Sequence, residues 1–250
     1  MRYVTFGNGD KTMVVVPGLT VGYVTDNASA LQDAFSSFAE DYTVYIFDIR
    51  DDVPDGYDIV RMSEDLAETM TEMGLRDVYM YGCSMGGIES MYISGKHPEL
   101  VSKVVIASSA GRSNDNSNRV FNRWIELAKA NDKHELGKNM GEYIYSEAFY
   151  EANMEVLIAS VACQSDESIS RFVNTAGVLV NFDVSEEAAA IRCPILVLGS
   201  KGDRVMTGQA AEEIARITGG EMLMYGPEYP HAVYDEAPDL ISHVKAFFDK

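Results

Sequence analysis

The feature that most constrains the fold is the stretch VYMYGCSMGGIES, where a short apolar run meets a glycine-rich corner. Residues 78–81 form an apolar run of strand length, and residues 85–97 show a helical pattern. Gly82 and Gly86 stand two positions on either side of Ser84, and because glycine has no Cβ, a strand and a helix can approach closely there. The stretch predicts a buried strand, a sharp turn with Ser84 at its tip, and a helix.

The same alternation of strand and helix runs through both ends of the chain. Continuous apolar runs of strand length are typical of strands buried on both faces, and the helical patterns between them carry one apolar face. This order predicts an α/β fold, with a mostly parallel central sheet flanked by helices and joined by right-handed crossovers. The expected strands include 11–16, 43–47, 78–81, 101–107, 195–200 and 221–226, and the expected helices 29–40, 59–73, 85–97, 207–218 and 237–249.

The alternation breaks in the middle of the chain. From residue 111 to about residue 187 no convincing strand pattern is present, and several amphipathic segments rich in methionine and aromatic residues follow one another. We therefore expect residues 1–110 and 189–250 to form one core domain. Residues 111–188 are expected to form an all-helical cap, or lid, inserted into it.

The composition limits the partners. The 250 residues carry a formal net charge of −19, which disfavours nucleic acid and anionic membranes. No apolar run approaches the roughly 18 residues of a membrane span, and the start of the chain has no signal-peptide pattern. The three cysteines are far apart and show no metal-binding spacing. We expect a cytoplasmic protein with a small-molecule substrate, no metal and no organic cofactor, and the sequence leaves the oligomeric state open.

Two potential nucleophiles stand side by side at the corner. The residue centred between the two glycines is Ser84, and a helix that begins at the tip aims its free N–H groups at the reaction centre. Cys83 precedes the tip and is expected to act as a small buried hydrophobic residue. The pattern therefore predicts Ser84 as the nucleophile, against the alternative of a glycine-rich turn with an incidental serine.

A serine hydroxyl needs a base, and the chain offers four histidines. His97 ends the helix that starts at the corner, so it is expected more than about 10 Å away from Ser84. His134 lies in a polar joint of the insertion, and His243 lies inside the last helix. His231 lies in a loop after the last strand, where open parallel sheets place their chemistry. Elimination therefore favours His231.

The base in turn needs an acid that fixes its tautomer. Asp203 follows the buried strand 195–200 at its carboxyl edge and is the predicted partner; the alternatives are a turn or helix-capping role for Asp203, and Asp48 as the acid. An oxyanion would need two backbone N–H groups. We expect them from Met85 and, in the loop after strand 11–16, from Leu19, with Thr20 as the alternative.

These residues together resemble the α/β-hydrolase superfamily, in particular its lidded esterases, C–C bond hydrolases, haloperoxidase-like enzymes and proline iminopeptidase-like enzymes. The resemblance rests on VVPGLT, YGCSMGG, GSKGDRV and YPHAVYDEAPD and covers the chain from Lys11 onward. It implies an α/β-hydrolase fold and transfer of an acyl group to the serine, followed by hydrolysis with a water that the histidine activates. Such relatives often have a histidine where this chain has Pro17.

The resemblance also implies that the helical cap covers the nucleophile and shapes the substrate pocket. Phe121, Trp124 and Tyr143 are the predicted substrate-binding residues, although aromatic residues at helical spacing more often pack helices together. The predicted function is a serine hydrolase acting on a small or medium carboxylic ester or thioester. The alternatives are a peptidase, a C–C bond hydrolase, and a ligand-binding homologue without turnover.

Overall fold

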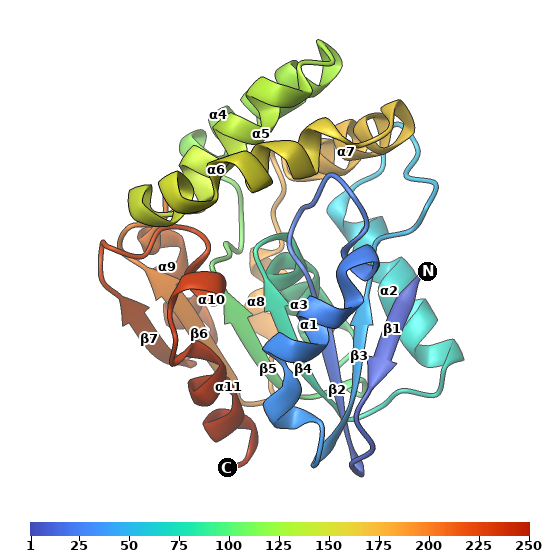
Figure 1. Cartoon of the computed structure of the whole chain (residues 1–250). Helices are drawn as coiled ribbons and strands as arrows, with labels where there is room; N and C mark the ends of the chain where they lie inside the picture. Colours follow the sequence, from blue (N-terminus) through green and yellow to red (C-terminus); the bar gives the residue numbers. More distant parts are fainter.

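The computed structural model describes all 250 residues and is built around one seven-stranded sheet (Figure 1). The strand order is β1-β3-β2-β4-β5-β6-β7, and only β1 runs antiparallel to its neighbour. The mostly parallel sheet predicted from the sequence is thus confirmed. The strands are β1 (Tyr3–Phe6), β2 (Lys11–Val16), β3 (Tyr42–Phe47), β4 (Val78–Cys83), β5 (Val101–Ala107), β6 (Ile195–Ser200) and β7 (Glu221–Tyr225).

Helices cover both faces of this sheet, as the apolar strand runs require. One apolar core lies on the side of α2, α3, α8 and α9, and a second lies on the side of α1 and α11. These helices are α1 (Ala28–Ala34), α2 (Ile59–Glu72), α3 (Met85–Lys96), α8 (Ser185–Ala190), α9 (Gly208–Thr218) and α11 (Leu240–Phe248). The sequence pattern of residues 29–40 predicts a single helix, but the structure ends α1 at Ala34 and continues with a short 3₁₀ turn, Ser36–Phe38.

Between β5 and β6 the chain forms helices only, apart from one isolated bridge between Arg112 and Asp183. Figure 1 shows α4 to α7 lying across the edge of the sheet at which the parallel strands end. The last helix of this stretch, α8, instead packs against α3 and belongs to the layer that flanks the sheet. The four crossing helices are α4 (Asp115–Lys129), α5 (Lys133–Ile144), α6 (Glu147–Ala162) and α7 (Asp166–Val178).

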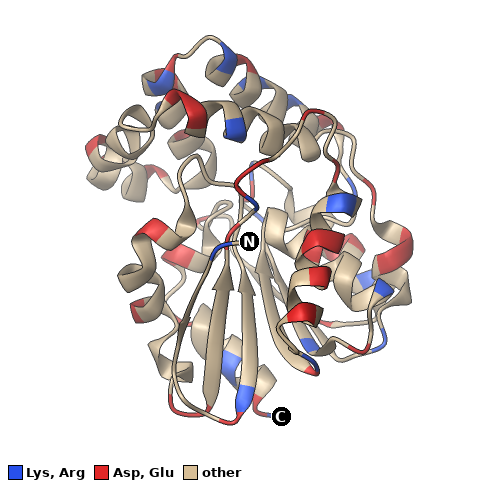
Figure 2. Cartoon of the chain, turned by 90° about the vertical axis from the view of Figure 1, so that its right-hand side faces the viewer, with Lys and Arg blue, Asp and Glu red and all other residues tan.

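The charged residues lie on the helices and loops and leave the strands almost free of charge (Figure 2). This distribution follows from burial, because an unpaired charge inside the sheet layers would lose its hydration. No helix of the structure is both long enough and hydrophobic enough to pass through a lipid bilayer.

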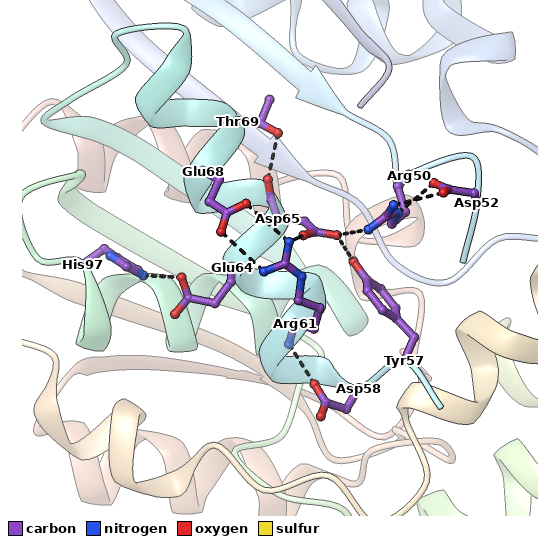
Figure 3. Close-up of polar contacts among 10 residues, drawn as sticks. All are labelled: Arg50, Asp52, Tyr57, Asp58, Arg61, Glu64, Asp65, Glu68, Thr69 and His97. Carbon is purple, nitrogen blue, oxygen red and sulfur yellow. Dashed lines mark hydrogen bonds and ion pairs between the residues drawn. The ribbon is translucent and has the colours of Figure 1, made fainter. Parts of the chain in front are cut away.

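A polar network attaches the loop after β3 to helix α2 (Figure 3). Asp65 on α2 accepts hydrogen bonds from Arg50, at 2.7 Å, and from the hydroxyl of Tyr57, and it pairs with Arg61 at 2.7 Å. Arg50 also donates to Asp52 at 2.8 Å. Burial and the hydrogen bond to Asp65 raise the pKa of Tyr57, so the phenol stays protonated as a donor. The loop between Asp48 and Asp58 is therefore held by these contacts on the side of the sheet that α2 covers.

Candidate active site

The corner predicted from the glycine spacing is a tight turn between β4 and α3. Ser84 has φ 52° and ψ −119°, an uncommon conformation for a residue with a side chain. A Cβ at Gly82 would overlap the carbonyl oxygen of Gly86, and a Cβ at Gly86 would overlap that of Val16. The two glycines therefore allow β4, α3 and β2 to meet at one point, with the Ser84 side chain at the tip.

Hydrogen bonds from neighbouring segments hold the strained turn in place. The Ser84 N–H donates to the carbonyl oxygen of Ala107 at 2.9 Å, and the Ser109 hydroxyl donates to the carbonyl oxygen of Ser84 at 2.8 Å. Within α3, the Ser90 hydroxyl donates to the carbonyl of Gly86 at 2.7 Å. The segment after β5 thus fixes the corner from the side, a contribution of Ser109 that the sequence pattern did not indicate.

Ser84, His231 and Asp203 meet although they are far apart in the sequence. The distance between Ser84 Oγ and His231 Nε2 is 3.0 Å, and His231 Nδ1 lies 3.0 Å from Asp203 Oδ2 and 3.1 Å from Asp203 Oδ1. All three residues are buried. The imidazole therefore bridges a hydroxyl and a carboxylate, an arrangement that can remove the proton of the hydroxyl when it attacks a carbonyl carbon.

His231 and two backbone N–H groups favour the charged form of the Asp203 carboxyl. Burial by itself would raise the pKa of this carboxyl, but the neighbouring His231 and the N–H groups of Val205 and Met206 outweigh it and lower the pKa. These two N–H groups donate to Asp203 Oδ1 at 2.8 and 2.9 Å. Asp203 therefore stabilises the turn after β6, which was the alternative interpretation of the sequence, and also contacts His231.

The other candidates for base and acid lie elsewhere. His97 pairs with Glu64 at 3.0 Å at the end of α3 (Figure 3), and His243 pairs with Asp239 at 3.3 Å on the surface. His134 is exposed on α5. Asp48 accepts hydrogen bonds from the N–H and the hydroxyl of Thr25, at 3.0 and 2.8 Å, and so anchors the loop after β2.

That loop, residues 17–27, lies against Ser84. A Cβ at Gly18 would lie 3.1 Å from Ser84 Cβ and 3.6 Å from Ser84 Oγ. The next N–H, that of Leu19, donates to no backbone group of the protein. Met85 is the first residue of α3, where a helical N–H has no partner within the helix. The two predicted donors therefore stand on the two segments that flank the hydroxyl.

Two arginines contact the loop after β2. Tyr23 lies between the guanidinium of Arg2, 3.8 Å from the ring centroid, and that of Arg171, at 3.7 Å. Arg171, which is buried on α7, also donates to the carbonyl oxygen of Val21 at 3.2 Å. No pattern in the sequence indicates this contact, because Arg2, Tyr23 and Arg171 come from three separate segments.

Cys83 is buried, as expected, beside the turn. Burial raises the pKa of its thiol to about 12, and the nearby charge of Asp235 acts in the same direction. The thiol therefore stays protonated at neutral pH, which makes it a poor nucleophile.

A buried carboxyl on α3 gives a pH-dependent stability. Glu89 is 3 % exposed and borders a small cavity together with Gly18, Asp48 and Met85. Burial, and to a smaller extent the charge of Asp65, raise the pKa of Glu89 to about 8. Since the unfolded chain loses this proton near pH 4.5, the folded state binds the extra proton between those values, and stability falls as the pH rises through that window.

We therefore expect Glu89→Gln to match the natural protein in stability near pH 5 and to exceed it by roughly 2 to 4 kcal/mol near pH 9. Urea unfolding of both proteins at the two pH values measures the difference. A stability difference that is the same at both pH values would contradict the assignment.

The predicted substrate-binding aromatic residues have other surroundings. Phe121 and Trp124 are buried against each other inside the helical layer, with 5.5 Å between their ring centroids, and Trp124 donates to Asn139. Tyr143 accepts a hydrogen bond from Arg119 at 3.0 Å and borders an open groove. None of the three lines the large cavity beside Ser84, which has a volume of about 460 Å³ and lies under α5 and α6.

Comparisons with known proteins agree with this architecture. Residues 13–244 match the profile of a family described as the Alpha/beta hydrolase family. A Rhizobium rhizogenes protein named "Putative carbamate hydrolase RutD" is 24 % identical over 226 residues, which cover 82 % of this chain and 83 % of that protein. The AB hydrolase superfamily protein YisY of Bacillus subtilis is 24 % identical over 206 residues, covering 77 % and 74 %.

Solved structures are similar over the full length of the chain. An alpha/beta hydrolase from a Medee basin deep-sea metagenome library gives a TM-score of 0.88 at 18 % identity and covers 100 % of this chain and 94 % of its own. The enol-lactonase of Burkholderia xenovorans gives 0.84 at 19 % identity, with coverage of 100 % and 96 %. At these identities the similarity establishes the fold.

Proposed function

The chain belongs to the alpha/beta hydrolase family and is an enzyme of that family, and we propose that it cleaves a small or medium carboxylic ester or thioester through an acyl-enzyme on Ser84. The observation that carries this proposal is the buried chain of contacts from Ser84 through His231 to Asp203. A hydroxyl, an imidazole and a carboxylate in this order form the arrangement that activates a serine for attack on a carbonyl group.

In the proposed reaction, Ser84 Oγ attacks the carbonyl carbon of the ester while His231 Nε2 takes the hydroxyl proton. Asp203 accepts a hydrogen bond from His231 Nδ1, which leaves Nε2 free as the base and stabilises the imidazolium that forms. The backbone N–H groups of Leu19 and Met85 stabilise the oxyanion. His231 then protonates the departing alcohol or thiol.

The second half of the reaction repeats these steps with water. His231 Nε2 removes a proton from water, the hydroxide attacks the acyl carbon, and the tetrahedral intermediate collapses with return of a proton from His231 to Ser84 Oγ. The carboxylic acid leaves and the free enzyme is restored.

We further propose that residues 111–188 act as a cap over this centre. Two observations support this assignment: helices α4 to α7 cross the carboxyl edge of the sheet (Figure 1), and α5 and α6 form one wall of the large cavity. The names of the relatives suggest which substrates to include in a panel, because carbamates and lactones, like esters, carry a carbonyl carbon bonded to a leaving oxygen.

A fluorophosphonate probe tests the proposal, because it reacts with a serine only when that serine is activated as a nucleophile. We expect the natural protein and Cys83→Ser to be labelled, and Ser84→Ala to remain unlabelled. Mass spectrometry of the labelled peptide measures the site. An absence of labelling in folded natural protein would favour a ligand-binding protein without turnover, whereas labelling that persists in Ser84→Ala would assign the nucleophile elsewhere.

A further inference from the structure

A large, partly open cavity of about 460 Å³ lies between the loop after β2, helix α1, the segment around Tyr234, and helices α5 and α6. Its volume lies within the range of small-molecule sites. Of the 28 residues that line it, 18 are hydrophobic, and none is a lysine, arginine or histidine. The cavity therefore suits a ligand with an apolar body and offers no cation to a ligand carboxylate.

This cavity is bordered by segments that adjoin Ser84 and His231. Gly18, whose Cβ position lies 3.6 Å from Ser84 Oγ, is part of its wall, and so is Cys83, the residue before Ser84. On the other side of the centre, Tyr234 lines the cavity with its ring centroid 6.4 Å from that of His231. A molecule held by Ser84 can thus extend one arm into this space.

Polar side chains meet at one part of the apolar wall. Asp235 is the only carboxylate that lines the cavity, and the Tyr145 hydroxyl donates to its Oδ2 at 3.2 Å. The side chains of Tyr81 and Tyr234 also line the cavity. A few convergent polar groups in an apolar cavity are typical of a site that recognises one functional group.

The charge of Asp235 is not neutralised by the protein. The Asp235 side chain is exposed to solvent, but partial desolvation by the surrounding protein raises the pKa of this carboxyl to about 6; the Tyr145 hydroxyl and His231 act against this shift, and the neighbouring Glu236 acts with it. The carboxylate of Glu236 is itself used, because it accepts hydrogen bonds from the N–H and hydroxyl of Ser146. Cys83 remains a neutral thiol at neutral pH. Near pH 7.5 Asp235 is therefore mostly ionised, without a cationic partner.

We propose that this cavity binds one arm of the substrate and that Asp235, together with Tyr145, recognises an ammonium group at the end of that arm. This inference rests on the proposed hydrolase function, since Ser84 holds the other end of the substrate. An ammonium group would pair with the carboxylate, and the rings of Tyr81 and Tyr234 would add attraction for a cation. A neutral hydroxyl would form no ion pair with this carboxylate, whose side chain is exposed to solvent in the protein without a ligand.

Two matched pairs of esters test the proposal and distinguish the acyl arm from the alcohol arm. The first pair is 4-nitrophenyl 6-aminohexanoate and 4-nitrophenyl heptanoate, and the second is 6-aminohexyl acetate and heptyl acetate. Within each pair an ammonium replaces a methyl group of similar size. At neutral pH we expect the natural enzyme to prefer the amine in kcat/KM by about tenfold or more in one of the pairs. Preference for the methyl compound in both pairs would overturn the proposal.

The measured quantity for the variants is the ratio of the two kcat/KM values in the preferred pair. Asp235→Asn is expected to lower this ratio about tenfold or more, because the amide has no charge. Asp239→Asn removes the same charge from an exposed site nearby and is expected to leave the ratio unchanged. An Asp235→Asn enzyme that keeps the ratio of the natural enzyme would refute the role of the carboxylate.

The pH dependence of the same ratio gives a second readout. We expect the preference for the amine to decline as the pH falls through about 6, because Asp235 then takes up a proton. A pH effect on the catalytic step itself is common to both esters and cancels in the ratio. A ratio that stays constant from pH 5 to pH 8 would contradict the assignment.

Calorimetry with heptylamine separates failure of this inference from failure of the proposed function. If the natural protein hydrolyses none of the esters and resists the fluorophosphonate, the hydrolase proposal fails, but the site predicts that heptylamine still binds and that Asp235→Asn abolishes the binding. If the esters are cleaved and heptylamine does not bind at any attainable concentration, the hydrolase proposal survives and the ammonium site is refuted.

Discussion

Replacement of either Ser84 or His231 by alanine is expected to lower kcat by roughly 10³ to 10⁶-fold on any ester that the natural enzyme cleaves. The expected loss is large because the two side chains share one proton at 3.0 Å. Without the hydroxyl there is no acyl-enzyme, and without the imidazole the hydroxyl keeps its proton at neutral pH. Steady-state kinetics with a chromogenic ester measures both variants, and thermal unfolding verifies that they fold.

The double variant gives the sharper result. Because the two residues act as a unit, Ser84→Ala combined with His231→Ala is expected to be about as slow as either single variant. His97→Ala is the matched control, since its imidazole pairs with Glu64 away from Ser84, and its kcat should stay within about twofold. A near-normal kcat for His231→Ala would remove this residue from the mechanism, and additive losses would mean that the two side chains contribute separately.

Asp203→Asn is the second variant with a very large expected effect, roughly 10³ to 10⁴-fold in kcat. The amide oxygen can replace Oδ1 and still accept the N–H groups of Val205 and Met206, so the turn after β6 is kept. The NH₂ group then takes the place of Oδ2, which lies 3.0 Å from His231 Nδ1. It can only donate there, so the proton of the imidazole moves to Nε2, and that nitrogen can no longer accept the proton of Ser84.

The pH profile distinguishes this tautomer effect from a loss of structure. We expect Asp203→Asn to unfold at a urea concentration similar to that of the natural protein near pH 7 and to remain slow at every pH at which the protein is folded. Asp48→Asn is the control, because Asp48 follows the end of another strand, β3, and contacts Thr25 and not His231. A kcat for Asp203→Asn within tenfold of the natural value would make Asp203 a turn residue without a role in orienting the base.

Much of the fold follows from local patterns in the sequence. The apolar runs at β2, β3, β4, β5 and β6 are long enough for strands and too short for helices, so the parallel sheet could be predicted from them. The approach of Ser84, Asp203 and His231 to one another could also be predicted, because each follows a strand at the carboxyl edge of the sheet, and parallel strands bring those ends together. With only four histidines in the chain, elimination was feasible.

The cavity could not be predicted, because its wall comes from segments that meet only in the folded chain. The helical period shows that Phe121 and Trp124 share an apolar face, but it does not show whether that face packs against another helix or borders an open space. The same reason applies to Asp235, which the sequence places in a loop next to His231 without indicating the neighbours that raise its pKa. The contact of Arg171 with Tyr23 likewise joins residues about 150 positions apart.

The contacts of Arg2 and Arg171 with the Tyr23 ring link the entry of substrate to the geometry of the active site. One guanidinium that holds the ring comes from Arg2 and the other from α7, so the loop that presents Leu19 is shared between the sheet domain and the helices above it. An outward movement of those helices that admits a large substrate would also separate Arg171 from Tyr23. The loop that carries Leu19 would then lose one of its contacts. A form with the helices moved outward would then bind larger substrates and hydrolyse them more slowly.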